Sequence, residues 1–214
     1  RQPERVYAII KAVRDAVPNS VPVSAKIRLG FEARDNYLDN AHAVADAGAS
    51  SLVVHARSKA DGYRPPAYWG SIGEINQQLN IPVIANGEIW SVEDYLRCRE
   101  RSGCDNVMLG RGLLACPDLA LQIKAHLAGT AYTPMGWLEV CTLLRHYFDL
   151  CRPNYPDKFA GNRIKQWLVY LRRQYSEADQ FFELIKRVQQ PDILNAHFDA
   201  QQSIHPRRAI ERSA

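Results

Sequence analysis

Two hydrophobic patterns alternate along the first 129 residues. Apolar residues three or four positions apart predict helices at 6–17, 38–45, 72–79, after Ser91 and at 119–127. Short apolar runs between them predict strands at 23–29, 52–55, 81–85 and 107–109. Ser91, with Asp94 three residues later, is typical of a helix N-cap, and Gly48 of a helix end. The alternation predicts repeated β-α units with four parallel strands.

Four polar or glycine positions accompany these strands at regular intervals. Lys26, His55, Asn86 and Gly110 are separated by 29, 31 and 24 residues, which is about the length of one β-α unit. A closed (β/α)8 barrel takes ~250 residues, so four units supply about half of one. The spacing therefore predicts either an incomplete barrel or a small open α/β sheet.

From residue 130 the hydrophobic pattern is helical throughout. Apolar positions predict helices at 137–147, 163–175 and 181–188, with Ser176 and Asp179 as the capping pair of the last. A loop rich in proline and asparagine ends the first of them at 153–156. We expect an all-α helical bundle over 130–206 and a frayed tail at 207–214.

Composition narrows the class of protein. With 214 residues, of which 46% are hydrophobic, the chain can bury a full core. Its five cysteines are odd in number and form no C-x-x-C pair, which argues against a disulfide framework or a zinc site. Neither a run of ~20 apolar residues nor a signal-peptide core is present, so we expect a cytoplasmic protein without a membrane segment or a metal. The net charge of +4 lies mostly in the C-terminal part and is compatible with an RNA partner.

Two short glycine-containing runs follow the last two predicted strands. In Asn86-Gly87-Glu88 and Gly110-Arg111-Gly112, the missing Cβ atoms of Gly87 and Gly112 let a ligand approach the backbone. The guanidinium of Arg111 suits a phosphate, and Glu88 can accept a hydrogen bond from a sugar hydroxyl. Ordinary tight turns, with Glu88 complementing a helix dipole, are the alternative interpretation. Because the two glycine-containing runs follow successive strands, a phosphate site is the favoured interpretation.

Lys26 and His55 each allow two interpretations. Lys26 lies on the polar face of its strand, so it would point into a barrel and need an anionic partner such as a cofactor. The alternative is a solvent-facing lysine on an edge strand. His55 ends an apolar strand, where barrel enzymes keep their sites, but a structural histidine is equally compatible.

The predicted helix at 163–175 combines basic and aromatic residues. Arg163, Lys165 and Arg173 alternate with aromatic side chains, a combination that suits phosphate contacts and base stacking in RNA. Ile164, Trp167, Leu168 and Leu171 form the apolar stripe and are expected in the core. A solvated basic face is the alternative.

Taken in order, these motifs resemble the tRNA-dihydrouridine synthases. The similarity is strongest to the bacterial branch that acts on position 16 of tRNA, and it corresponds to the C-terminal two thirds of a synthase. It rests on five segments, Lys26-Ile27-Arg28-Leu29-Gly30, Val53-Val54-His55-Ala56-Arg57, Ile84-Ala85-Asn86-Gly87-Glu88-Ile89, Met108-Leu109-Gly110-Arg111-Gly112 and Arg163-Ile164-Lys165-Gln166-Trp167-Leu168.

The resemblance implies a flavin enzyme with a helical tRNA-binding domain. Residues 1–129 would be the C-terminal half of an FMN-binding TIM barrel, and 130–206 the tRNA-binding domain of a monomer. Reduced FMN, recharged by NADPH, would reduce a flipped-out uridine, while a cysteine expected upstream of Arg1 would protonate it. By motif, the FMN contacts are Lys26, His55, Asn86, Gly87, Glu88, Gly110 and Arg111. The tRNA contacts are Tyr63, Arg163, Lys165, Tyr170 and Lys186.

Two other functions remain open at this point. The chain could be a non-catalytic tRNA-binding module, because none of its five cysteines matches the family's proton donor. It could also belong to another FMN-dependent barrel oxidoreductase that acts on a small molecule, such as a dihydroorotate-dehydrogenase-like protein.

Overall fold

The chain consists of two compact units. The computed structural model describes residues 2–204, with the side chains described through residue 201. Contacts divide the chain into Arg1–Gly112 and Leu113–Ala214. The first unit holds all the strands of the described residues, whereas the second is entirely helical. Each unit is described by itself below.

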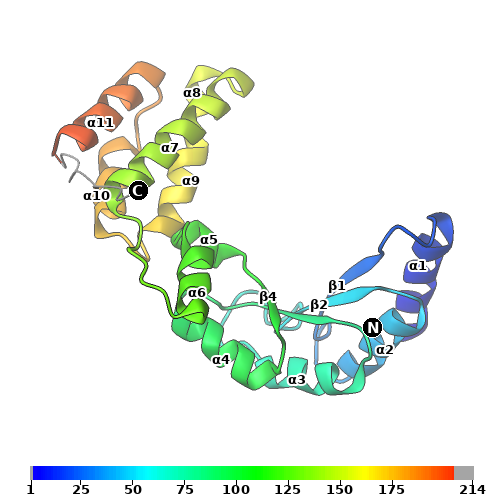
Figure 1. Ribbon diagram of the computed structural model, residues 1–214. Coiled ribbons are helices and arrows are strands. Elements are labelled where there is room, and N and C mark those ends of the chain that lie inside the picture. The colour runs from blue at the N-terminus through cyan, green and yellow to red at the C-terminus, as the bar shows by residue number, and fades with distance from the viewer. Residues whose placement is uncertain (1, 205–214) are drawn as a thin grey trace. The chain divides into compact units, whose positions relative to one another are not determined.

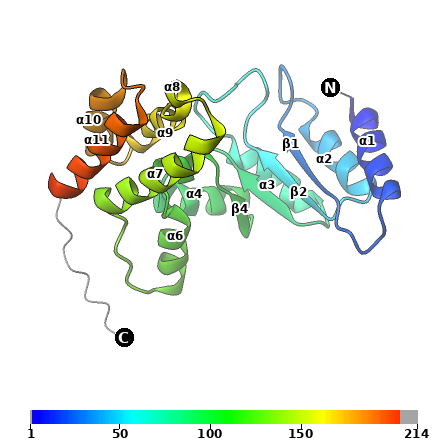
Figure 2. The ribbon, with the colours of Figure 1, turned by 90° about the horizontal axis from the view of Figure 1, so that it is seen from above.

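The first unit is built on a four-stranded parallel sheet. Its strands lie in chain order, β1-β2-β3-β4, and Figure 2 shows them from above. The helices that connect them lie on one side of the sheet (Figure 1). This is the arrangement of a β/α barrel segment, because an open doubly wound sheet reverses its strand order and has helices on both faces. The strands are β1 (Ser24–Arg28), β2 (Ser51–His55), β3 (Val83–Asn86) and β4 (Asn106–Met108).

The helices of the first unit follow the predicted pattern. They are α1 (Pro3–Ala16), α2 (Tyr37–Asp46), α3 (Trp69–Gln78) and α4 (Val92–Ser102). Both predicted end signals are confirmed. The hydroxyl of Ser91 accepts a hydrogen bond from the amide of Asp94, and Gly48, at φ +89°, follows the last residues of α2.

Alternating burial along β1 gives its two faces different roles. Ala25 is buried against the helices, whereas Lys26 is exposed on the opposite face. β2 is the most buried strand, and Leu52 and Val54 are fully buried along with Ile72 of α3. The apolar core therefore lies between the sheet and its helices, and the polar ends of the strands remain available for a site.

The second unit packs its helices around an aromatic core. Figure 1 shows the four long helices α7, α9, α10 and α11, whose buried cluster includes Trp137, Leu144, Phe148, Phe181 and Phe198. The indole of Trp137 donates a 2.8 Å hydrogen bond to Gln201 inside it. The elements are α5 (Arg111–Ala115), α6 (Leu119–Ala128), α7 (Trp137–Cys151), the 3₁₀ turn η1 (Arg152–Asn154), α8 (Asp157–Ala160), α9 (Asn162–Leu171), α10 (Ser176–Ile185) and α11 (Pro191–Ile204).

Several helical details differ from the sequence-based expectation. Helix α9 ends at Leu171 rather than 175, and Tyr175 rather than Ser176 occupies the N-cap of α10. Helix α11 was not expected, although Pro191 at its start and the buried pair Leu194 and Phe198, four residues apart, signal it. The predicted tail at 207–214 lies outside the described residues. Within residues 2–204, no helix is long and apolar enough to cross a membrane.

Candidate anion-binding site

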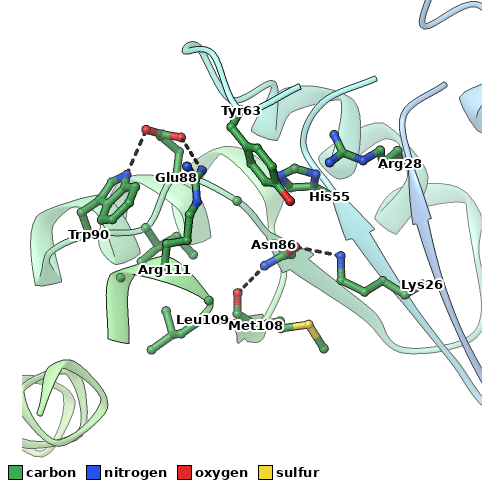
Figure 3. A pocket seen from close by; sticks show the side chains of 14 residues that line it. Lys26, Arg28, His55, Tyr63, Asn86, Glu88, Trp90, Met108, Leu109 and Arg111 are labelled. Carbon is green, nitrogen blue, oxygen red and sulfur yellow. Dashed lines mark hydrogen bonds and ion pairs between the residues drawn. The ribbon is translucent and has the colours of Figure 1, made fainter. Parts of the chain in front are cut away.

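An open pocket of about 270 Å³ lies at the carboxyl ends of the four strands (Figure 3). All seven residues that the sequence assigned to a cofactor line it, although they come from four separate strand ends. The lining comprises Lys26, Arg28, His55, Tyr63, Asn86, Gly87, Glu88, Ile89, Trp90, Met108, Leu109, Gly110, Arg111 and Gly112. The sequence expectation that these segments converge is therefore met by the fold.

Strand register brings the polar side chains together. Arg28 pairs with His55, His55 with Asn86, and Asn86 with Met108 across the sheet. Residues in register on parallel strands point the same way, so these side chains form one row along the sheet edge. Lys26 lies one side-chain period earlier on β1 and extends toward the same row.

The amide of Asn86 connects three strands. Its Oδ1 accepts a 3.0 Å hydrogen bond from Lys26 Nζ, and its Nδ2 donates a 2.7 Å hydrogen bond to the carbonyl of Met108. Both contacts are visible as dashed lines in Figure 3. Asn86 thus holds the Lys26 ammonium in the pocket while leaving it other protons to donate.

The backbone angle of Gly87 and its contact with His55 both require a glycine at this position. Its φ is +115°, and a Cβ atom would come within 2.8 Å of Cδ2 of His55. The space that a Cβ atom of Gly87 would fill is therefore taken by the imidazole of His55, while the Gly87 backbone lines the pocket. At Gly110, by contrast, a Cβ atom would meet nothing within 4 Å.

His55 is neutral in this setting. Burial lowers the pKa of its imidazole to about 4, and the positive charges of Arg28, Lys26, Arg57 and Arg111 add to the effect. The neutral ring keeps one donor and one acceptor nitrogen at pH 7. A bound anion would offset these positive charges and raise the pKa of His55.

The pocket carries more positive than negative charge. Lys26, Arg28 and Arg111 line it, and Glu88 is its one lining carboxylate among the described residues. The pKa of Lys26 is lowered, first by burial and then by Arg28. No carboxylate in the described part of the chain lies within ion-pair distance of its ammonium. These are the electrostatic conditions that favour an anionic ligand.

Three side chains approach the carboxylate of Glu88. Arg57 places Nη2 2.5 Å from Oε2, and the indole of Trp90 donates a 2.9 Å hydrogen bond to Oε1. Arg111 Nη2 is 3.7 Å from the same Oε2. Burial opposes ionisation of Glu88, but these donors outweigh it and hold the pKa of its carboxyl below the usual range.

Aromatic rings flank the guanidinium of Arg111. It lies 4.3 Å from the ring centre of Tyr63 and 5.1 Å from that of Trp90. Tyr63, which the sequence assigned to tRNA, is 61% exposed and stands at this pocket. Arg28 donates hydrogen bonds to the carbonyls of Ser58 and Gly62 and so holds the loop that carries Tyr63.

Three side chains with hydrogen-bond donor groups at this site were not assigned from the sequence. Arg28 and Trp90 line the pocket, and Arg57 supports it from behind. Arg28 could have been found from the predicted strands, since it lies two residues after Lys26 on the same face. No local sequence signal marks Arg57 as part of the site, because its partner Glu88 is 31 residues away in the chain.

The residues assigned to tRNA in the helical unit are not among the lining residues of this pocket. Arg163 of α9 is exposed and donates a hydrogen bond to the hydroxyl of Tyr155. Lys165 is half-buried, its pKa is lowered by burial, and its Nζ donates a 2.7 Å hydrogen bond to the Val188 carbonyl. Tyr170 is half-buried, and Lys186 is exposed beside Glu183.

All five cysteines are buried thiols. Burial raises the pKa of Cys98, Cys116 and Cys141 to about 12, and none of the five lines the pocket. Cys116 belongs to a buried polar cluster in which its thiol donates to Asp118. Residues 2–204 contain no group of three metal-binding side chains.

Comparison with known proteins identifies the family. The dihydrouridine synthase (Dus) family matches residues 1–205. A protein of Pseudomonas syringae pv. tomato is 48% identical over 187 residues, covering 87% of this chain and 59% of that protein. A Pseudomonas putida protein is 46% identical over 187 residues, which cover 87% of this chain and 58% of that protein. A protein of Escherichia coli O157:H7 is 44% identical over 198 residues, which cover 92% of this chain and 61% of that protein.

All three relatives are named tRNA-dihydrouridine(16) synthase. The chain spans about three fifths of their length. The family match, in contrast, extends over nearly all of this sequence and includes every strand end that lines the pocket. The chain belongs to the dihydrouridine synthase family.

Proposed function

We propose that the protein is a flavin-dependent tRNA-dihydrouridine synthase that reduces the C5–C6 double bond of uridine 16. The observation that carries this proposal is the cationic pocket at the strand ends, in a chain of this family. Enzymes built on β/α barrels keep their sites at this edge, and phosphate groups bind at the loops after the last strands. The names of the relatives support tRNA as the substrate.

The pocket fits the phosphate end of FMN. Lys26 has no carboxylate partner among residues 2–204, and the open space beside Gly110 leaves room at the backbone. Arg111 offers a planar guanidinium, which binds phosphate oxygens in pairs. Asn86, Gly87 and the Glu88 carboxylate would bind the hydroxyl groups next to the phosphate, and the neutral His55 would donate or accept one further hydrogen bond.

Within the reaction, this chain binds and orients the reactants. Reduced FMN, recharged by NADPH, supplies the hydride when it is bound. Residues 1–129 form the C-terminal half of the flavin barrel in this proposal, with the sheet edge fixing Lys26, His55 and Asn86. In this proposal the proton donor is none of Cys98, Cys104, Cys116, Cys141 or Cys151, because all five are buried and none lines the pocket.

Residues 130–206 form the tRNA-binding domain in this proposal. Arg163 is fully exposed and lies 5.5 Å from the ring centre of Tyr155, which suits a phosphate contact beside a stacked base. Lys186 is also exposed, while Lys165 and Tyr170 are half-buried on α9. Tyr63 is the exception, since it presents its exposed ring at the flavin pocket, where a flipped uracil would stack.

Deleting the gene tests the function. We expect dihydrouridine at position 16 to disappear from the tRNA pool, as measured by mass spectrometry of isolated tRNA, and wild-type protein to restore it. The double variant Lys26→Ala, Arg111→Ala should not restore it, whereas Lys11→Ala, on the exposed surface of α1, should. Unchanged dihydrouridine at position 16 in the deletion strain would contradict the proposal.

A further inference from the structure

Arg57 is a fully buried charged residue behind the anion-binding pocket. It follows β2 and does not line the pocket. Its Nε donates a 3.1 Å hydrogen bond to the carbonyl of Pro66, and its Nη2 pairs with Glu88. A buried guanidinium needs a counter-charge, and Glu88 supplies it. Arg57 thus ties the loop after β2 to the loop after β3.

Arg57 and Arg111 compete for one oxygen of Glu88. Oε2 is 2.5 Å from Arg57 Nη2 but 3.7 Å from Arg111 Nη2. The other oxygen accepts from Trp90. Both oxygens are therefore engaged by groups other than Arg111, whose guanidinium remains beyond hydrogen-bond distance and rests between the rings of Tyr63 and Trp90.

We propose that Arg57 is a positioning residue for the anion site, which holds the Glu88 carboxylate so that the guanidinium of Arg111 stays available to a phosphate. This inference deepens the proposed function and rests on it for the identity of the ligand. With Arg57 in place, one buried cation offsets the carboxylate, and the cations that line the pocket keep their surplus charge for the ligand.

Removing Arg57 should change the charge state of Glu88. Burial is the largest influence on the pKa of this carboxyl and raises it, and Arg57 is the strongest of the opposing groups. Without Arg57, the ionised carboxylate takes Arg111 as its partner at high pH, and the protonated carboxyl releases Arg111 at low pH. The other charged or titratable groups around Glu88 are Lys26, Arg28 and the neutral His55 on the pocket side and Asp94, Arg97 and Arg101 on the α4 side.

A double-mutant cycle tests this coupling, with FMN as the probe. We expect Arg57→Met to weaken FMN binding about tenfold at pH 8, measured by quenching of flavin fluorescence. In the Glu88→Gln background, where no carboxylate competes for Arg111, the same substitution should change the affinity less than about twofold. Arg57→Lys retains the charge and should lie near wild type.

The pH profile distinguishes positioning from a structural role. The ratio of wild-type to Arg57→Met affinity should fall toward one between pH 8 and pH 5.5, because protonation of Glu88 frees Arg111. A residue that only supports the loops through Pro66 would lower affinity equally in both Glu88 backgrounds and at every pH. That result would overturn the proposal.

A measurement on the wild-type chain keeps the inference testable if Arg57→Met does not fold. Adding FMN should shift the NMR signal of Arg111 Nε–H, while the signal of Arg57 Nε–H, which lies outside the pocket lining, stays in place. Equal shifts at Arg57 and Arg111 would overturn the positioning role.

Failure of the proposed function can be distinguished from failure of the positioning role of Arg57. If wild-type protein binds no FMN, the cofactor assignment fails, and ligand-free NMR titration of the Glu88 carboxyl then decides the inference. Arg57→Lys should leave the pKa of Glu88 low, and Arg57→Gln should raise it and make the Arg111 signal follow the Glu88 titration. If the Arg111 signal of Arg57→Gln does not change as Glu88 titrates, the coupling between Glu88 and Arg111 is contradicted.

Discussion

The two units of this chain use charge in opposite ways. In Arg1–Gly112, charged and polar groups lie inside the fold, where Glu88 and His55 line a pocket and the buried Arg57 pairs with Glu88. In Leu113–Ala214, the main core is aromatic and aliphatic, the buried carboxylate of Asp118 is held by hydrogen bonds, and basic residues such as Arg163 are exposed. Under the proposed function, buried and fixed charges would bind the flavin, and solvated charges would face the tRNA.

Physical chemistry accounts for this difference. Parallel strands end at one edge, so their register can align side chains from four segments and fix them with hydrogen bonds, as Asn86 does. Helices present their polar faces to solvent, where each charge interacts weakly and is screened by salt. Changes in the first unit should therefore act on ligand affinity, and surface changes in the second on long-range attraction.

The largest expected effect is on the helical core. Phe181→Ala removes a fully buried ring and should lower the free energy of unfolding by about 3–5 kcal/mol in urea titrations. Leu184→Ala, on the same helix but 55% exposed, is the control and should change it by less than about 0.5 kcal/mol. Equal losses in the two variants would contradict the assignment of the core.

The next largest effect should follow from Gly87→Ala. The substitution places a side chain at φ +115° and against His55, so we expect a loss of about 1–3 kcal/mol in unfolding free energy together with weaker FMN binding. Gly62→Ala is the matched control, because Gly62 also has positive φ but faces open space. It should cost only about 1 kcal/mol. Similar losses at the two sites would show that the contact with His55 is unimportant.

Burial of His55 should make the first unit sensitive to acid. Its pKa of about 4 lies below the usual 6.5, so the unfolded chain binds a proton more readily. The resulting stability is complete above pH 6.5 and is lost as the pH falls toward 4. By pH 5, wild type should lose about 1–2 kcal/mol more unfolding free energy than His55→Gln. Parallel pH profiles of the two proteins would argue against a buried neutral histidine.

The smallest effect on stability is expected at Arg163. Arg163→Ala should leave the unfolding free energy within about 0.5 kcal/mol of wild type. It should nevertheless reduce the slope of log affinity for tRNA against log salt concentration by about 1, because one phosphate contact is lost. Lys124→Ala, at an exposed position of α6, should leave the slope unchanged. Equal slopes for Arg163→Ala and wild type would remove Arg163 from the tRNA interface.

Sequence reasoning found the elements that depend on local pattern. Hydrophobic periodicity gave the four strands, and the position of Lys26, His55, Asn86 and Gly110 near strand ends predicted their convergence. The sequence did not predict contacts between residues that are far apart in the chain. The partner of Arg57 lies 31 residues away, and the need for glycine at 87 comes from the imidazole of His55 on another strand.

The central claim is that the pocket of the first unit binds the phosphate of FMN. Its most direct test is a comparison of FMN with riboflavin, which lacks the phosphate, by fluorescence titration of the wild-type chain. We expect FMN to bind at least about tenfold more tightly, inorganic phosphate to compete with it, and Arg111→Ala to remove the difference. Equal affinities for FMN and riboflavin, or no binding of either, would contradict the account.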